Sequence, residues 1–312
     1  MTVPDSRPVS QASFPDLIPG VLSFGSVNLL AGASGVGKTC LTAYLLTQIR
    51  AGLPVFGHVV TPPTAVGYVC ADRGWASARY WLTKAGTQDI PFYSLADDAS
   101  FGPSRLRNKG ALVQILGECI DKLALPPGAF VVVDPLALFM GGNLNDYQSC
   151  AIALIEIRRL CAARNIPLLG LAHASKQKAD KREQYKRLQD RILGSAAQHG
   201  YGDTQLYLAS PEETGEKFYT FLWHPHTSPA EVFPLGRDPH GMFLPWDQAP
   251  EVLEEDTLLE HIPSTEEGLS FGELVLVSNL SRATVHRRLQ SLLQEGRIDR
   301  VGHGCYRRKP TN

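Results

Sequence analysis

A phosphate-binding motif lies near the start of the chain. Residues Gly32 to Thr39 read G-A-S-G-V-G-K-T and fit the pattern G-x-x-x-x-G-K-[ST] at every fixed position. Its glycines let successive backbone N–H groups turn toward phosphate oxygens, and the helix expected after it adds the positive end of its dipole. Lys38 is expected to reach the β- and γ-phosphates of ATP, and the Thr39 hydroxyl is expected to bind Mg²⁺. The residues expected to contact the nucleotide are Gly32, Ala33, Ser34, Gly35, Val36, Gly37, Lys38, Thr39 and Cys40.

Three further polar residues each end an apolar run. Asp134 ends AFVVVD and is expected to hold Mg²⁺ through water, although an Asp before a proline also suits a turn. Asp72 ends VGYVCAD, where a carboxylate can orient the attacking water or cap a helix. His173 ends LLGLAH, where it can contact a γ-phosphate or simply be satisfied at a strand end. We expect Lys38, Asp72, Asp134 and His173 to be catalytic, and Thr39 and Asp134 to hold the metal.

The elements that must position these residues alternate between strands and helices. The expected strands are continuous apolar runs, which is typical of a parallel sheet with helices on both faces. Their alternation with helical stretches predicts an α/β domain with a mainly parallel sheet. Two later segments alternate more strongly and are predicted to be partly antiparallel strands. The predicted strands are 26–32, 65–72, 129–134, 166–173, 204–210 and 217–224, and the predicted helices are 39–52, 111–124 and 149–165.

Charge is unevenly distributed along a nearly neutral chain. The 312 residues have a formal net charge of −1, and their 44% hydrophobic content excludes a mainly disordered protein. Segment 247–273 holds nine acidic residues and no Lys or Arg, whereas segment 281–312 holds eight basic and two acidic residues. Segment 176–191 has seven basic and three acidic residues. Basic patches favour a nucleic-acid partner, although solvated surface helices can also carry them.

The composition also bears on the compartment. No stretch approaches the roughly 18 apolar residues of a membrane span, and the N-terminus lacks a hydrophobic signal core. The six cysteines are scattered without a CxxC pair. We therefore expect a reduced, cytoplasmic protein with no membrane partner and no zinc site.

The C-terminal segment 269–308 is expected to be a winged helix. A helix at 271–277, a turn and a helix at 282–295 precede a short hairpin that turns at 302–304. The second helix of such a unit usually enters the major groove of DNA, although winged helices also dock proteins. The residues expected to contact DNA are Arg282, Thr284, Arg287, Arg288, Arg307 and Arg308.

Taken in this order, the motifs resemble those of the RecA-like ATPases, and most closely the RepA-type hexameric replicative helicases of plasmids and phages. The resemblance spans residues 15–235 and is carried by Gly32–Thr39, A-D-R at 71–73, V-V-V-D-P at 131–135 and H-A-S-K at 173–176. The resemblance implies ATP with Mg²⁺ as cofactors and a ring-forming homo-oligomer, a hexamer in that family. It also implies a replication initiator or loader as a further partner. It also implies that 176–191 faces a central channel. The candidates there for contacts with single-stranded DNA are Lys176, Lys178, Lys181, Arg182, Lys186 and Arg187.

Two departures from the family pattern bear on the rate of hydrolysis. Asp72 stands where the family usually has a glutamate, and its carboxylate is one methylene shorter. No arginine finger matches cleanly, and Arg237, Lys217 and His226 are the possible substitutes. A finger contributes a large factor in rate. Its loss would suggest a weak ATPase, or one that a partner activates.

Four segments follow from these observations. They are a flexible arm at 1–20, a RecA-like ATPase domain at 21–246, an acidic linker at 247–262 and a winged-helix DNA-binding domain at 263–312. The leading interpretation is a replicative DNA helicase of a mobile element that moves on single-stranded DNA. The alternative is a nucleotide-gated DNA-binding adaptor or regulator with weak ATPase activity and no unwinding. A metabolic P-loop kinase is a third interpretation.

Overall fold

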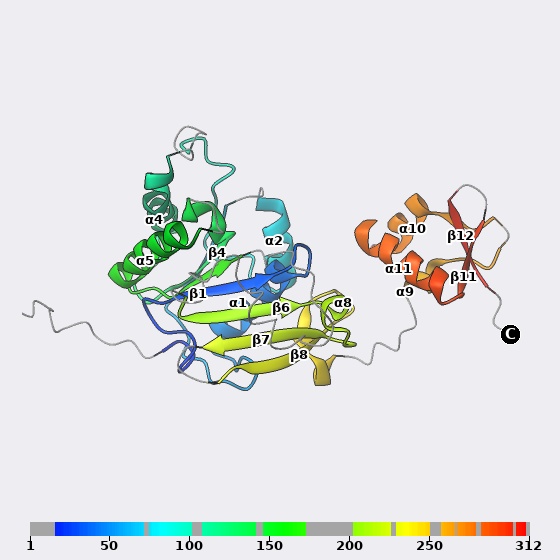
Figure 1. The fold of residues 1–312 in the computed structure, drawn as a ribbon, viewed down its shortest axis with the longest axis horizontal. Helices are drawn as coiled ribbons and strands as arrows, with labels where there is room; N and C mark the ends of the chain where they lie inside the picture. Colours follow the sequence, from blue (N-terminus) through cyan, green and yellow to red (C-terminus); the bar gives the residue numbers. More distant parts are fainter. Residues whose placement is uncertain are drawn as a thin grey trace, which may run out of the picture. The chain divides into compact units, whose positions relative to one another are not determined.

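The chain folds into two compact units, residues 1–249 and residues 250–312 (Figure 1). Among the described residues, no helix combines the length and the apolar character that crossing a bilayer requires. The computed structural model describes residues 16–71, 75–101, 108–141, 146–172, 202–225, 229–249, 257–265, 267–278, 282–301 and 304–309.

A mixed β-sheet forms the centre of the first unit (Figure 1). Neighbouring strands from β3 through β6 run parallel, and those from β6 through β9 run antiparallel. The predicted α/β class with a mainly parallel sheet is therefore confirmed. In spatial order the strands are β3 (Phe92–Ser94), β2 (Val66–Cys70), β4 (Phe130–Asp134), β5 (Leu168–Leu171), β1 (Val27–Gly32), β6 (Thr204–Ala209), β7 (Tyr219–Pro225), β8 (Glu231–Arg237) and β9 (Phe243–Pro245).

Helices cover both faces of the parallel part of this sheet (Figure 1). Helices α1 (Lys38–Ala51) and α2 (Trp75–Lys84) pack on one face, and α4 (Leu112–Lys122) and α5 (Tyr147–Arg164) pack on the other. The sequence of β4 is continuously apolar because both faces of the strand are buried. Phe130 faces α1 and α2, and Val131 faces α4 and α5. The shorter helical segments are η1 (Lys109–Ala111), η2 (Leu136–Met140), α8 (Pro211–Thr214) and η4 (Trp246–Gln248).

Helix ends follow from local sequence. Helix α1 ends at Gly52, which has a positive φ of 65° and donates its N–H back to the last turn. Helix α5 begins after Asp146, whose carboxylate accepts a hydrogen bond from the N–H of Ser149 at 2.8 Å. Asn165 then ends α5 in the left-handed conformation, which asparagine tolerates better than most residues. Both helices are thereby fixed against the sheet at defined positions.

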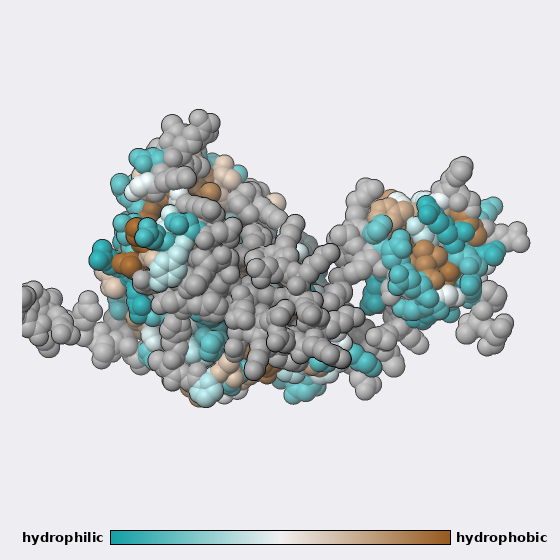
Figure 2. Space-filling model, in the orientation of Figure 1, coloured by the Kyte–Doolittle hydropathy of each residue, from teal (hydrophilic) through white to brown (hydrophobic). Residues whose placement is uncertain are grey.

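The second unit is a helix-turn-helix with an antiparallel hairpin, which is the winged arrangement. Its core contains Leu274, Val285, Leu289, Leu292 and Ile298. Its surface in Figure 2 is mostly hydrophilic, with a smaller apolar area. The elements are α9 (Thr257–His261), β10 (Leu269–Ser270), α10 (Phe271–Ser278), α11 (Arg282–Gln294), β11 (Ile298–Val301) and β12 (Cys305–Arg308), and the strands are ordered β10–β12–β11.

Helix α9 lies inside the predicted linker. Its Leu258 and Leu259 are buried with Ile262 in the core of the C-terminal unit, so these residues pack as part of that unit. Burial of three neighbouring apolar side chains explains why an acidic stretch ends in an ordered helix. The other predicted domain boundaries stay predictions.

Candidate functional site

The loop between β1 and α1 is shaped by its glycines and by Lys38. Gly35 and Gly37 have positive φ angles of 80° and 110°, which non-glycine residues rarely adopt. The Lys38 ammonium folds back over the loop and donates hydrogen bonds to the carbonyl oxygens of Gly32 at 2.9 Å and Ala33 at 3.0 Å. These bonds close the loop around a positive charge that is only 8% exposed.

Helix α1 adds to the positive character of this loop. Gly37 is its N-cap and supplies no side-chain oxygen, and the first turn contains no acidic residue. The N–H groups at the start of the helix therefore keep their partial positive charge, which favours an anion. Among the predicted nucleotide contacts, the positions from Gly35 to Thr39 meet at this helix end.

Asp134 and Thr39 come together at the carboxyl ends of the strands. Asp134 is the last residue of β4, and Thr39 is the second residue of α1. The Thr39 hydroxyl donates to the Asp134 carboxylate with an Oγ1–Oδ2 distance of 3.0 Å. The two residues predicted to hold a metal are therefore adjacent, although they lie 95 residues apart in the chain.

Tyr68 is a third member of this cluster, and no motif in the sequence points to it. Its hydroxyl donates to the same Asp134 Oδ2 atom at 2.7 Å. Tyr68 lies on β2, which pairs with β4, and it is fully buried. Alternation in the sequence places Asp134 on the same face of its own strand as Val132, and the observed pairing of Tyr68 with Val132 puts Tyr68 on that face. What sequence alone does not supply is that these strands are neighbours.

Arg237, expected as a possible substitute for the arginine finger, contacts the phosphate-binding loop of its own chain. At the end of β8, it donates to the carbonyl oxygen of Val36 at 3.2 Å and to that of Gly241 at 2.8 Å. Its guanidinium lies 4.1 Å from the ring centre of Phe243. Because the C=O and N–H of a planar peptide unit point in opposite directions, this contact turns the N–H of Gly37 away from Arg237. As a result, Arg237 stabilises the phosphate-binding loop of its own chain.

Cys40 directs its side chain into the core. It is 1% exposed, and its Sγ atom lies 3.4 Å from the carbonyl oxygen of Gly241. Burial raises the pKa of the Cys40 thiol, and the Arg237 guanidinium opposes this only in part. The thiol is therefore kept neutral, which leaves the backbone of Cys40 as its only group suited to a phosphate.

Several predicted site residues lie outside the described residues. The strand predicted at 65–72 ends at Cys70, and the strand predicted at 166–173 ends at Leu171. The N–H of Ala71 donates to the backbone oxygen of Asp134 at 2.7 Å, so the chain leaves β2 beside the Thr39–Asp134 pair. The residues outside the described ranges are Asp72, His173, Lys176, Lys178, Lys181, Arg182, Lys186, Arg187 and His226, and their roles stay predictions.

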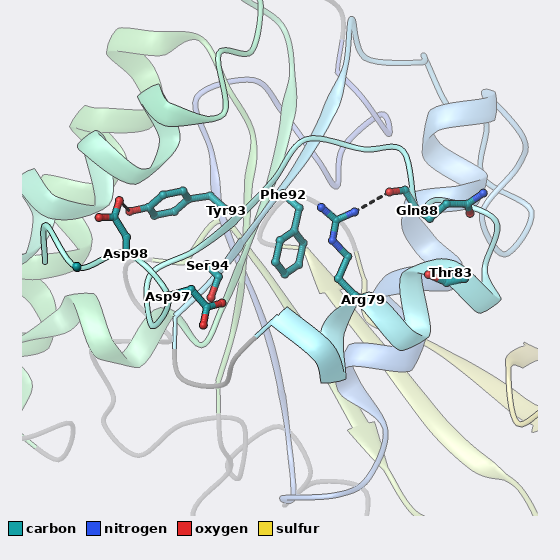
Figure 3. A pocket seen from close by; sticks show the side chains of 9 residues that line it. Arg79, Thr83, Gln88, Phe92, Tyr93, Ser94, Asp97 and Asp98 are labelled. Carbon is teal, nitrogen blue, oxygen red and sulfur yellow. Dashed lines mark hydrogen bonds between the residues drawn. The ribbon is translucent and has the colours of Figure 1, made fainter.

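A groove of about 680 Å³ opens beside β3, at the edge of the described sheet (Figure 3). Arg79 of α2 lies over Phe92, and Asp98 contacts Tyr93 across the other side of the groove. Asp98 also forms an ion pair with Lys122, which with its hydrogen bonds holds the pKa of that carboxyl well below its usual range. Asp98 is paired with Lys122, and Arg79 donates to the carbonyl oxygen of Gln88, so the candidate site is placed at the glycine-rich loop.

In the C-terminal unit, the residues predicted to contact DNA lie on α11 and β12. Arg288 is exposed, while Val285 and Leu289 on the same helix are buried, as the predicted amphipathic pattern requires. On β12, a guanidinium nitrogen of Arg307 lies 3.8 Å from a carboxylate oxygen of Asp299 on β11. Asp299 therefore partly neutralises the charge of Arg307. Arg308, also on β12, is partly exposed. Arg282, Thr284 and Arg287 are on α11, but their side chains are outside what the structure describes.

Comparison with known proteins finds a separate match in each unit. Residues 2–179 match the family model of an AAA domain, and residues 257–302 match that of an IclR helix-turn-helix domain. One similar solved structure is a KaiC-like protein from the hyperthermophilic archaeon Pyrococcus horikoshii OT3. It is 13% identical, the match covers 76% of this chain and 98% of that chain, and the TM-score is 0.46. No curated protein gives a match.

Proposed function

Because the chain belongs to the AAA domain family, we propose that it is an ATP-dependent DNA-binding motor. The observation that carries the proposal is the contact of Thr39 with Asp134 beside Lys38, at the carboxyl edge of a parallel sheet. This is the edge at which open α/β sheets bind their ligands. The same chain also carries a helix-turn-helix unit, which supports DNA as the partner.

The residues of the loop fit a magnesium nucleotide. A hydroxyl and a carboxylate are oxygen donors of the kind that Mg²⁺ prefers, and Thr39 and Asp134 would hold it. Lys38 and the N–H groups at the start of α1 would neutralise and orient the phosphates. Bound ATP with Mg²⁺ supplies the phosphoryl group that is transferred to water. Asp72 would accept the proton of the attacking water, and His173 would contact the γ-phosphate.

The finer form of the proposal is a homo-oligomeric, hexameric replicative helicase of a plasmid, phage or other mobile element. The basic segment 176–191 would contact single-stranded DNA, and its balance of seven basic to three acidic residues supports this. The C-terminal unit would contact duplex or origin DNA through α11 and β12, with Arg282, Thr284, Arg287, Arg288, Arg307 and Arg308 as the candidates. Binding that rests on such phosphate contacts should weaken steeply with salt.

Arg237 favours a second candidate function, a nucleotide-gated DNA-binding adaptor or regulator. Its guanidinium is bound to Val36 and Gly241 of its own chain and packed on Phe243, so it is committed to its own loop. Acting on a neighbouring subunit as an arginine finger would require breaking these contacts. With Asp72 in place of a glutamate, this supports slow hydrolysis in which ATP sets an assembly state.

Steady-state ATP hydrolysis distinguishes the two candidates. Phosphate release would be measured without DNA, with single-stranded DNA and with duplex DNA, beside a Lys38→Ala control. Strong stimulation by single-stranded DNA that the control lacks is the result expected of a motor. Binding of ATP and duplex DNA with negligible, unstimulated turnover would favour the adaptor. Turnover that persists in Lys38→Ala would contradict both.

A further inference from the structure

Tyr68 is held in one position by its packing. Its ring is fully buried and stacks on Phe92 of β3, with centroids 5.5 Å apart and an interplanar angle of 10°. The guanidinium of Arg79 lies 4.6 Å from the centre of the Phe92 ring and donates to the carbonyl oxygen of Gln88 at 2.7 Å (Figure 3). The Tyr68 hydroxyl is therefore oriented by a stack that runs from α2 across the edge strand β3 to β2.

The register of the strands brings this hydroxyl to Asp134. Tyr68 pairs with Val132 on β4, and Asp134 follows two residues later on the same face. Tyr68 reaches the Asp134 Oδ2 atom at 2.7 Å, and Thr39 reaches the same atom at 3.0 Å. A hydroxyl that donates to a carboxylate makes a stronger bond than one between neutral groups. The carboxylate is therefore held between one donor from the first turn of α1 and one from β2.

We propose that Tyr68 is a positioning residue of the nucleotide site, whose hydroxyl holds the Asp134 carboxylate toward Thr39 before Mg²⁺ arrives. This inference rests on the proposed nucleotide function and adds a residue to it. Outer-sphere partners that orient a metal ligand lower the cost of organising the site when the metal binds. Tyr68 would thus act on the metal through Asp134 without touching the nucleotide.

The competing explanation is structural, since a buried phenol needs a hydrogen-bond acceptor wherever it lies. A structural role predicts lower stability and an equal loss of nucleotide affinity with or without Mg²⁺. A positioning role predicts a loss confined to the part of the affinity that Mg²⁺ provides. The two explanations are separated by the Mg²⁺ gain, which is the dissociation constant of a fluorescent ATP analogue in EDTA divided by its dissociation constant in saturating Mg²⁺.

The test compares Tyr68→Phe with Tyr93→Phe in the full-length chain. Tyr93 is a matched control, because it lies on the neighbouring strand and its hydroxyl also donates to an aspartate, Asp98, at 2.5 Å. Tyr68→Phe should leave the affinity in EDTA unchanged and reduce the gain from Mg²⁺ by about ten-fold, within the range for outer-sphere partners. Tyr93→Phe should leave both affinities unchanged.

Three outcomes would overturn the inference. The first is an unchanged Mg²⁺ gain in Tyr68→Phe, while wild type shows one, which leaves the proposed function standing. The second is an equal loss in EDTA and in Mg²⁺, which assigns Tyr68 to structure alone. The third is a wild-type chain that binds no ATP analogue, which also removes the proposed function. Should Tyr68→Phe not fold, Phe92→Leu serves as a second variant, because it loosens the stack and keeps the Tyr68 hydroxyl. Its Mg²⁺ gain should also fall, and an unchanged gain in Phe92→Leu would equally refute the positioning role.

Discussion

Replacing Gly32 with alanine should destabilise the first unit because of a backbone contact. Gly32 ends β1 and pairs with Leu208 of β6, and a Cβ atom built on it would lie 2.6 Å from the Leu208 carbonyl oxygen. That distance is shorter than any ordinary carbon–oxygen contact, and the oxygen belongs to the backbone of a central strand. The β1–β6 pair must therefore shift to admit a methyl group.

A second loop glycine provides a matched comparison with the opposite geometry. A Cβ on Gly35 would meet nothing within 4 Å, but its φ of 80° is in the left-handed region. The expected cost of Gly35→Ala is therefore that of the left-handed backbone, about 1 kcal/mol. For Gly32→Ala we expect about 2 kcal/mol, in the middle of the range for overpacking a closely packed site.

The assay is thermal unfolding without nucleotide, followed by tryptophan fluorescence. All four tryptophans lie in the first unit, at Trp75, Trp81, Trp223 and Trp246, so the signal reports that unit alone. For a domain of this size, Gly32→Ala should lower Tm by about 4–8 °C and Gly35→Ala by about 2–4 °C. A Gly35→Ala that is less stable than Gly32→Ala would refute the reasoning, as would a Gly32→Ala with the wild-type Tm.

Two other perturbations test contacts at the loop and at the groove. Arg237→Met should weaken ATP binding by roughly ten-fold, since a lost hydrogen bond from a charged donor costs about 1.5 kcal/mol. Arg237→Lys keeps a charged donor and should therefore keep part of the affinity. Isothermal titration would measure both variants, and affinities equal to that of wild type would contradict the role of Arg237. Lys122→Met should flatten the acid limb of the stability profile measured by urea unfolding. Lys122 lowers the pKa of Asp98 in the folded protein. The pair therefore adds to the free energy of unfolding above the pKa that Asp98 has in the unfolded chain, about 4, and this contribution is lost as the pH falls below that value. An acid limb as steep as that of wild type would count against this pairing.

The sequence was most informative where a local pattern alone determines the element. Strand β4 is apolar on both faces and ends at Asp134 as predicted, and the loop before α1 is specified by residues that are close together in the chain. The predictions did not include β3 and β8. Strand β3 has only three half-buried residues, and β8 contains Pro234 and Gly236, both of which argue against a strand.

The contacts that sequence reasoning missed at the site join distant segments. Tyr68 and Asp134 are separated by 66 residues, and Val36 and Arg237 by 201. Neither Tyr68 nor Arg237 belongs to a motif, so the type of residue gave no indication of its partner. Both contacts follow from the order of the strands in space, which the alternation of strands and helices does not determine. Motif residues can therefore be assigned from sequence, and the residues that orient them require the tertiary structure.

The position of β1 has a consequence for how the protein is made. This strand is among the first parts of the sheet to be synthesised, yet its neighbours are β5 and β6, which begin at Leu168 and Thr204. At about 5–20 residues per second, this apolar strand is synthesised roughly 7–28 seconds before its first partner, β5. During that interval its backbone is open to wrong pairing, so a slow-folding nascent chain should depend on chaperones more than its final stability suggests.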